Sequence, residues 1–125
     1  MAKYTLERME QIRGKQVFDK LVVDGVAPFD TFIEELEEKY RSEAMILYSY
    51  MDLVSNLHSL PDTKFHPYSS GKDGVREYEF KTKHLRVYAI EQKGGKIIII
   101  GGTKANQAKD QAEFRRLKQG YIASL

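Results

Sequence analysis

Residues 75–104, VREYEFKTKHLRVYAIEQKGGKIIIIGGTK, decide the fold of this 125-residue chain. Three runs within this segment, 75–81, 85–91 and 96–100, are rich in β-branched, aromatic and aliphatic residues, which suit a pleated and half-buried strand. Gly94 and Gly95 separate the last two runs, and paired glycines accept the positive φ angles of a tight hairpin. The segment therefore predicts an antiparallel meander of three strands, with a helix following it.

The two faces of this meander differ in chemistry. Residues 97–100 are all isoleucine, which predicts the most central strand, with both faces covered. Successive side chains of a strand point to opposite faces. In the middle strand, the aliphatic set is Leu85, Val87 and Ala89, and it alternates with Arg86, Tyr88 and Ile90. We expect the aliphatic face to pack against helices and the face with the guanidinium and the phenol to carry the function.

The remaining segments complete an α+β domain. Asp30 is a good N-cap, and apolar residues recur at helical spacing from 29 to 40, opposite an acidic and solvated face. The other expected elements are a first strand over 15–23, a second and more buried helix over 43–58, a polar loop over 62–74 and a C-terminal helix over about 106–122. Residues 1–14 are expected to form a short or flexible N-terminal segment. The prediction is a single domain over 1–125, in which an antiparallel sheet of the N-terminal strand and the three-strand meander packs against two helices, with a C-terminal helix.

The composition excludes several classes of protein. The chain is long enough to bury a core without covalent cross-links, and the absence of cysteine excludes a disulfide scaffold and thiolate chemistry. No apolar run approaches the roughly 20 residues that a membrane helix needs. The first 15 residues carry charges throughout and lack the apolar core of a signal peptide. We therefore expect a soluble, cytoplasmic protein that makes no use of a membrane.

The net charge of +2 hides an asymmetry along the chain. Residues 1–71 hold 8 Lys or Arg against 12 Asp or Glu, whereas residues 72–125 hold 12 against 6. The basic charge therefore falls on the meander and the last helix. Such a patch suits a polyanion such as nucleic acid, or an acidic protein partner, although a merely solvated surface has the same composition.

Two polar residues fall on the apolar stripe of the last helix. Gln107 and Asp110 share that stripe with Phe114, Leu117 and Tyr121. Buried polar groups need hydrogen-bond partners. We expect these two structural residues to tie the start of the helix to Lys104 or to Arg86.

The order of elements and two motifs together resemble the RelE/ParE toxin superfamily, and most closely its HigB-type, phage-derived-protein-like branch. The motifs are LRVY at residues 85–88 and IIIIGGTKANQAKD at residues 97–110. In that branch, a strand with Glu-Phe-type residues precedes an arginine on the next strand. A hydrophobic strand then leads into a Lys-x-x-Gln-x-x-Asp pattern, present here as Lys104, Gln107 and Asp110. The resemblance covers the chain from Lys15 onward.

The resemblance implies a type II toxin that cleaves mRNA in the ribosomal A site. Attack of the ribose 2′-OH on the adjacent phosphate would need no metal or cofactor. The implied partners are ribosome-bound mRNA and a cognate antitoxin, whose small acidic segment would cover the basic face. Arg86 and Lys104 would stabilise the phosphate, and His84 and Tyr88 are the candidates for proton transfer. Further contacts with RNA are expected from Lys81, Lys83, Arg76 and Lys109.

Two other functions stay open at this point. Some members of the superfamily act on DNA gyrase, so the basic face could instead dock on a protein without catalysis. A degenerate, phage-derived member would retain the fold alone. The family pattern often has two adjacent lysines after the last strand, whereas residues 102–105 here read Gly-Thr-Lys-Ala, with a single cation.

Overall fold

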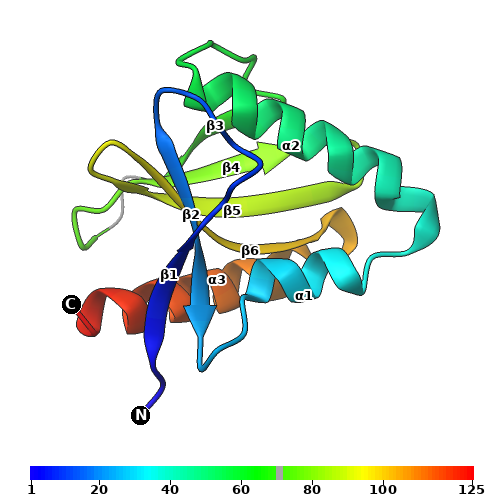
Figure 1. Ribbon diagram of the computed structural model, residues 1–125. Helices are drawn as coiled ribbons and strands as arrows, with labels where there is room; N and C mark the ends of the chain where they lie inside the picture. The colour runs from blue at the N-terminus through cyan, green and yellow to red at the C-terminus, as the bar shows by residue number, and fades with distance from the viewer. Residues whose placement is uncertain (70–71) are drawn as a thin grey trace.

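The structure is a computed structural model that describes residues 1–69 and 72–125. It has three layers, with a six-stranded sheet between two helices on one face and a third helix on the other (Figure 1). The strands are β1 (Tyr4–Arg8), β2 (Val17–Val23), β3 (Phe65–Ser69), β4 (Glu77–Lys81), β5 (Leu85–Gln92) and β6 (Gly95–Thr103). The helices are α1 (Pro28–Glu34), α2 (Arg41–Ser55) and α3 (Gln107–Ala123), with 3-10 turns η1 (Glu38–Tyr40) and η2 (Lys104–Asn106). The α+β class and the C-terminal helix are as predicted.

The sheet is mixed, so the prediction of a purely antiparallel sheet is wrong. Its strand order is β1-β2-β6-β5-β4-β3, and β2 runs parallel to β6 while all other pairs are antiparallel. Gly95 at the start of β6 allows a close approach to β2, because a Cβ atom there would lie 1.7 Å from the carbonyl oxygen of Val17. Alternation of side chains predicts a strand but says nothing of its direction beside a distant neighbour.

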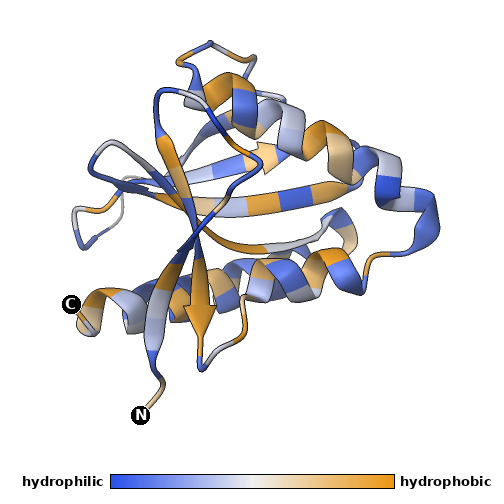
Figure 2. Ribbon diagram, viewed as in Figure 1, coloured by the Kyte–Doolittle hydropathy of each residue, from blue (hydrophilic) through white to orange (hydrophobic). Residues whose placement is uncertain are grey.

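The hydrophobic core lies on both faces of the sheet. Phe18, Val87 and Ile98 pack on one face with the side chains of α1 and α2. On the other face, α3 covers the sheet with Phe114 and Leu117. The sheet therefore has no open face over its central strands, and the apolar segments of β2 and β6 lie together in its middle (Figure 2).

This arrangement confirms the central place of one strand and shows what covers the face with Arg86 and Tyr88. Ile97 to Ile99 are buried in β6, which has β2 on one side and β5 on the other, so this strand is central as predicted. The face with Arg86 and Tyr88, which we expect to carry the function, is covered by α3. Sequence periodicity identified the face correctly but did not show that a helix covers it.

The N-terminal segment is part of the sheet. Instead of a flexible end, residues 4–8 form β1, which pairs antiparallel with β2. Met9 and Ile12 in the following turn are only 2% and 5% exposed. Residues 1–14 therefore contribute an edge strand and two core side chains.

The loop predicted over 62–74 contains the edge strand β3. Pro67 lies within it, and proline is tolerated at the edge of a sheet because one side of the backbone needs no hydrogen-bond partner. Ser70 and Gly71, also within that predicted loop, lie outside the described residues. The helical pattern over 29–40 is divided between α1 and the separate turn η1.

Candidate functional site

Three of the four predicted catalytic residues meet at one end of the sheet. Across β5 and β6, Leu85 pairs with Thr103 and Arg86 pairs with Gly102. One step further, the backbone N–H of Lys104 donates to the carbonyl oxygen of His84 over 2.8 Å. The turn between β4 and β5 therefore lies against the connection from β6 to α3, and we call this region the β4–β5 end.

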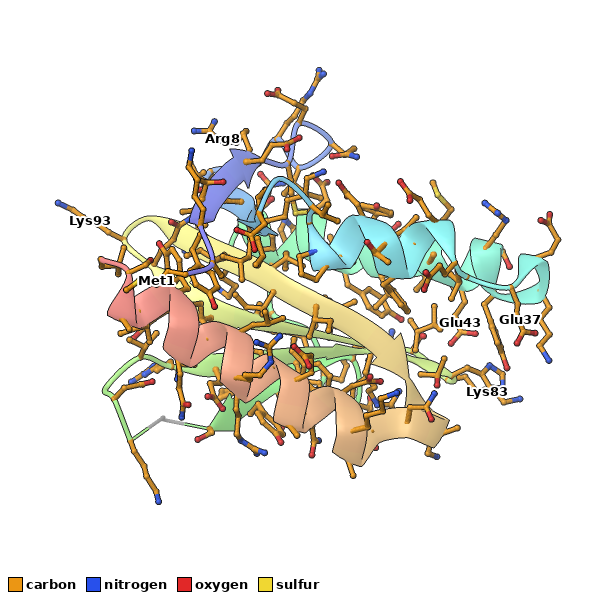
Figure 3. All side chains as sticks on the ribbon, turned by 90° about the horizontal axis from the view of Figure 1, so that it is seen from below. Met1, Arg8, Glu37, Glu43, Lys83 and Lys93 are labelled. Atoms are coloured by element: carbon orange, nitrogen blue, oxygen red, sulfur yellow. The ribbon has the colours of Figure 1, made fainter. Side chains whose placement is uncertain are left out.

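Glu43, at the start of α2, holds His84 in place. The Nδ1 atom of His84 lies 2.9 Å from one carboxylate oxygen of Glu43, and the backbone N–H of His84 donates to the other over 2.5 Å. The hydroxyl of Thr82 donates to that second oxygen as well, and the ring of Tyr40 lies 5.1 Å from the imidazole. Figure 3 shows Glu43 and Lys83 at the same end of the molecule.

The Glu43–His84 pair leaves one ring nitrogen available. The side chain of His84 is 45% exposed, that of Glu43 only 14%. Among the described residues, Nε2 of His84 has no hydrogen-bond partner. Burial alone would raise the pKa of Glu43, but the hydrogen bonds from Thr82 and His84 outweigh it and lower that pKa below its ordinary value. An ionised carboxylate that accepts from Nδ1–H makes Nε2 a proton acceptor.

Arg86 folds back under the turn that carries His84. Its Nη1 atom donates to the carbonyl oxygens of Thr82 at 2.6 Å and Leu85 at 2.8 Å, and the residue is only 8% exposed. Its Nε atom is buried without a hydrogen-bond partner among the described residues. The guanidinium therefore braces the β4–β5 turn, and only Nη2 is left for a ligand.

Tyr88 lies in the core. Its ring stacks on Phe114 with centroids 5.3 Å apart and meets the edge of Tyr68 at 5.8 Å. The residue is fully buried, and burial raises the pKa of its hydroxyl well above the ordinary value. The burial and the ring contacts give Tyr88 a packing role.

Four of the predicted RNA contacts and phosphate ligands surround the β4–β5 end. Lys81 lies directly opposite Arg86 across β4 and β5, and Lys83 follows in the turn. Lys104 and Lys109 are exposed where α3 begins. Like charges opposite each other repel, and a bound anion would relieve that repulsion.

Arg76 lies apart from these cations. It precedes β4, so it is at the other end of that strand from Lys83. Its backbone N–H donates to the carboxylate of Glu91 over 3.1 Å. The structure therefore does not bring Arg76 together with the other predicted RNA contacts.

Asp110 docks α3 onto β6. Its carboxylate lies so close to Gly102 that a Cβ atom there would be 1.8 Å from it, which explains the glycine. Burial raises the pKa of Asp110, against the lowering effects of Lys109 and the backbone N–H of Thr103. Its contacts among the described residues are with the β6 backbone, at Gly102 and Thr103, in place of the expected contacts with Lys104 or Arg86. Gln107, the first residue of α3, is half-buried.

The side chains that orient His84 cannot be recognised from the sequence. Nothing in the sequence points to Glu43 or Thr82, because Glu43 lies 41 residues before His84 and is an ordinary residue for the start of a helix. A second pair, His66 and Glu79, joins β3 to β4 with a 2.8 Å contact at Nε2 of the imidazole. Its Nδ1 atom lies 2.8 Å from the carbonyl oxygen of Pro67, so both ring nitrogens of His66 are engaged and the pair is structural.

Comparisons with known proteins give no independent indication of the function. No protein-family model, curated protein or solved structure matches the chain. Among the described residues, no helix is both long enough and apolar enough to cross a bilayer. The functional argument therefore depends on the β4–β5 end and its charges.

Proposed function

We propose that this protein is a metal-independent endoribonuclease, the toxin of a type II toxin–antitoxin pair, which cleaves ribosome-bound mRNA. The single observation that carries the proposal is the Glu43–His84 pair, whose free Nε2 atom lies on a surface lined with lysines. Within the observed order, the succession of β2, α1, α2, the strands β4 to β6 and the C-terminal helix α3 is the one expected of the RelE/ParE superfamily, and it supports the proposal further, although β1 and β3 are additional strands.

The residues have distinct roles in the proposed reaction. Nε2 of His84 accepts the proton of a ribose 2′-OH while the oxygen attacks the adjacent phosphorus. The bond from phosphorus to the 5′-oxygen breaks, the departing oxygen takes a proton from water, and a 2′,3′-cyclic phosphate is left. Glu43 stabilises the imidazolium that forms, as a carboxylate on the second ring nitrogen does in other acid–base pairs.

Cations stabilise the charge that develops on the phosphorane oxygens. Lys104 lies beside the site, because its backbone N–H donates to the carbonyl oxygen of His84. Lys81 and Lys83 extend the surface along the turn, where they would follow the RNA backbone. Arg86 acts as a positioning residue, since its guanidinium holds the turn through two carbonyl oxygens. An acidic antitoxin segment would neutralise the same lysines.

Cleavage of a ribosome-bound message in a purified translation system, mapped by primer extension, tests the proposal. We expect cuts at A-site codons for the wild type and a decrease of roughly 10²- to 10⁴-fold for His84→Asn, which keeps a donor near the Nδ1 position. The matched control is His58→Asn, an exposed histidine beyond the end of α2, and it should cleave like the wild type. Undiminished cleavage by a folded His84→Asn variant would exclude His84 as the base.

A non-catalytic docking function is the second candidate. It is favoured by the burial of Arg86 and Tyr88, because two of the four predicted catalytic side chains then serve the fold. In this case, the lysines of the β4–β5 end bind an acidic protein surface, such as that of a topoisomerase. The absence of cuts by folded wild-type protein, together with salt-sensitive inhibition of DNA gyrase, would support this function over the first.

A further inference from the structure

A cavity opens between α1 and α3, beside the candidate site. It has a volume of about 370 Å³ and is lined by residues 100–103 at the end of β6. Its other sides come from α1, from the segment that leads through η1, and from the start of α3. Figure 3 shows Glu37, which lines this cavity, at the same end of the molecule as Glu43 and Lys83. A cavity of this volume lies within the size range of pockets that hold small organic groups.

The paired glycines at the end of β6 bring side chains from both helical layers to this cavity. A Cβ atom at Gly101 would lie 2.3 Å from the ring of Phe32, and one at Gly102 would lie 1.8 Å from the carboxylate of Asp110. Phe32 comes from α1 and Asp110 from α3, and both line the cavity. A larger residue at either glycine would displace one of these side chains. The cavity therefore combines an aromatic wall with a carboxylate that is held against β6.

Tyr40 connects the cavity to His84. Its side chain lines the cavity, and its ring centroid lies 5.1 Å from that of the imidazole. The ammonium of Lys39 lies 5.1 Å from the same ring, so Tyr40 is already engaged within the chain. Phe32, which is half-buried, is then the aromatic side chain that a ligand can contact. A group bound in the cavity lies one side chain away from His84.

The charged side chains of the cavity are all acceptors. Glu35, Glu37 and Asp110 line it, and no lysine or arginine is found among its described lining residues. The carboxylate of Glu37 lies 3.4 Å from the ammonium of Lys39, and that of Asp110 is in contact with the backbone of β6. Glu35, which is exposed at the C-terminal cap of α1, has no such engagement among the described residues. It is therefore the carboxylate that the fold leaves for a ligand.

Of the four RNA bases, guanine matches a carboxylate best. Its N1–H and its 2-amino group are adjacent donors on the Watson–Crick edge, so the two oxygens of one carboxylate accept from both. Adenine and cytosine place a ring acceptor beside their amino donor, and uracil places carbonyl oxygens on both sides of its single N–H. Each of these three bases therefore brings an acceptor against the carboxylate. Proteins read single-stranded RNA by such contacts to base edges, together with contacts between bases and aromatic rings.

We propose that this cavity binds the guanine base of a nucleotide next to the cleaved bond and makes the cleavage guanine-selective. The proposal rests on the proposed ribonuclease function. Phe32 contacts the plane of the base, and Glu35 accepts from N1–H and from the 2-amino group. The ribose and the phosphate lie toward Lys104, which directly follows the cavity residue Thr103. Acceptors then meet the donor edge of the base, whereas the phosphate meets the lysines outside the cavity.

An organic cation is the alternative ligand of an acidic cavity. The chain's own lysines already meet part of this demand, since Lys39 pairs with Glu37 and the charge of Lys109 acts on Asp110. Among the described residues, no group of three or more potential ligands is arranged to hold a metal ion. An uncharged base with two adjacent donors uses the carboxylate of Glu35 without bringing a further cation next to these lysines.

Amide NMR spectra of the protein with nucleoside 3′-monophosphates test the proposal independently of cleavage. We expect guanosine 3′-monophosphate to shift the signals of Gly101 and Gly102, with a Kd at least about 10-fold lower than those of the adenosine, cytidine and uridine compounds. Inosine 3′-monophosphate, which lacks the 2-amino group, should bind with an intermediate Kd. Glu35→Gln should reduce the preference for guanosine to less than about 2-fold. The matched control is Glu34→Gln, an exposed neighbour outside the cavity lining, which should keep the preference.

The cleavage assay separates this proposal from the ribonuclease function on which it rests. Wild-type cuts should be enriched next to guanosine, and Glu35→Gln should lose this enrichment. Cuts without base preference, together with equal binding of the four nucleotides, would overturn the guanine site and leave the ribonuclease function in place. Selective binding of guanosine 3′-monophosphate without any cuts would support the guanine site and exclude the ribonuclease. Shifts of Gly101 and Gly102 by spermidine, but not by the nucleotides, would identify a cation site and overturn the proposal.

Discussion

The backbone N–H of Lys104 donates to the carbonyl oxygen of His84, and this 2.8 Å bond joins the 3-10 turn η2, just before α3, to the turn between β4 and β5. A third segment of the chain reaches the same place, because Glu43 on α2 binds the imidazole and the backbone of His84. Three segments of the chain, namely the β4–β5 turn, the connection from β6 to α3 and the start of α2, therefore hold the β4–β5 end together. A rigid site of this kind needs no large rearrangement to present Nε2 of His84 to a substrate.

The ionised carboxylate of Glu43 should make the stability of the protein depend on pH. Because its hydrogen bonds lower its pKa below the ordinary 4.5, Glu43 stabilises the fold above that pH, and this contribution is lost as the pH falls through the lower, folded-state pKa. Glu43→Gln should reduce the free energy of unfolding by about 2 kcal/mol at pH 7 and by less at pH 3. Urea unfolding at pH 7, 5 and 3 measures this, with the exposed Glu34→Gln as control. A difference that stays constant across these pH values would contradict the prediction.

Removal of the Tyr88 hydroxyl should be harmless. The oxygen is buried and makes no hydrogen bond of good geometry among the described residues, although the side chains of Glu79 and Gln111 lie close enough to affect its pKa, so Tyr88→Phe should change the free energy of unfolding by no more than about 1 kcal/mol. Tyr88→Ala should lose roughly 3–5 kcal/mol, because it removes the ring that stacks on Phe114. Denaturant unfolding and the cleavage assay measure both effects. Loss of cleavage by a stable Tyr88→Phe variant would contradict the prediction and show that this hydroxyl takes part in the reaction.

Lys118 should be essential to the docking of α3 at the far end of the sheet. Its Nζ atom lies 2.9 Å from carboxylate oxygens of both Glu77 and Asp73, and the residue is 2% exposed. Lys118→Met leaves the buried carboxylate of Glu77 uncompensated, so we expect a loss of roughly 3–5 kcal/mol in the free energy of unfolding. The double variant with Glu77→Gln should recover part of this loss.

A thermodynamic cycle of the two single variants and the double variant provides that measurement. The control for loss of a lysine is Lys109→Met, an exposed change expected to cost less than about 0.5 kcal/mol. If the decreases in the free energy of unfolding caused by Lys118→Met and Glu77→Gln add up in the double variant, the ion pair makes no contribution of its own.

Local patterns were sufficient for the elements that dominate the fold. The isoleucine run and the paired glycines predicted β5, β6 and their hairpin, because side-chain shape and permitted φ angles act over a few residues. The direction of β2 beside β6 depends on a connection of more than 70 residues, which no local pattern encodes. The strand β3 could not be predicted, because proline in a short polar segment such as that around Pro67 usually indicates a loop.

The candidate site, like the fold, could be predicted from the sequence only in part. His84, Arg86 and Lys104 come from the motif region, and register across β5 and β6 brings them together. The sequence could not show that Glu43 orients His84, because that contact depends on how α2 packs across the sheet. Nor could it show the burial of Arg86 and Tyr88, since α3 presents a weak apolar stripe that includes the polar Asp110 and the charged Lys118.

The parallel pairing of β2 with β6 also sets the order in which the protein can be assembled during its synthesis. Residues 17–20 pair with residues 95–98, so β2 emerges from the ribosome long before its inner neighbour has been translated. Contacts between such distant parts of a chain form late and slowly. The same delay applies to the site, because His84 is joined to Lys104 only after β6 has been made. A nascent chain shorter than about 100 residues therefore carries neither the closed sheet nor the assembled site.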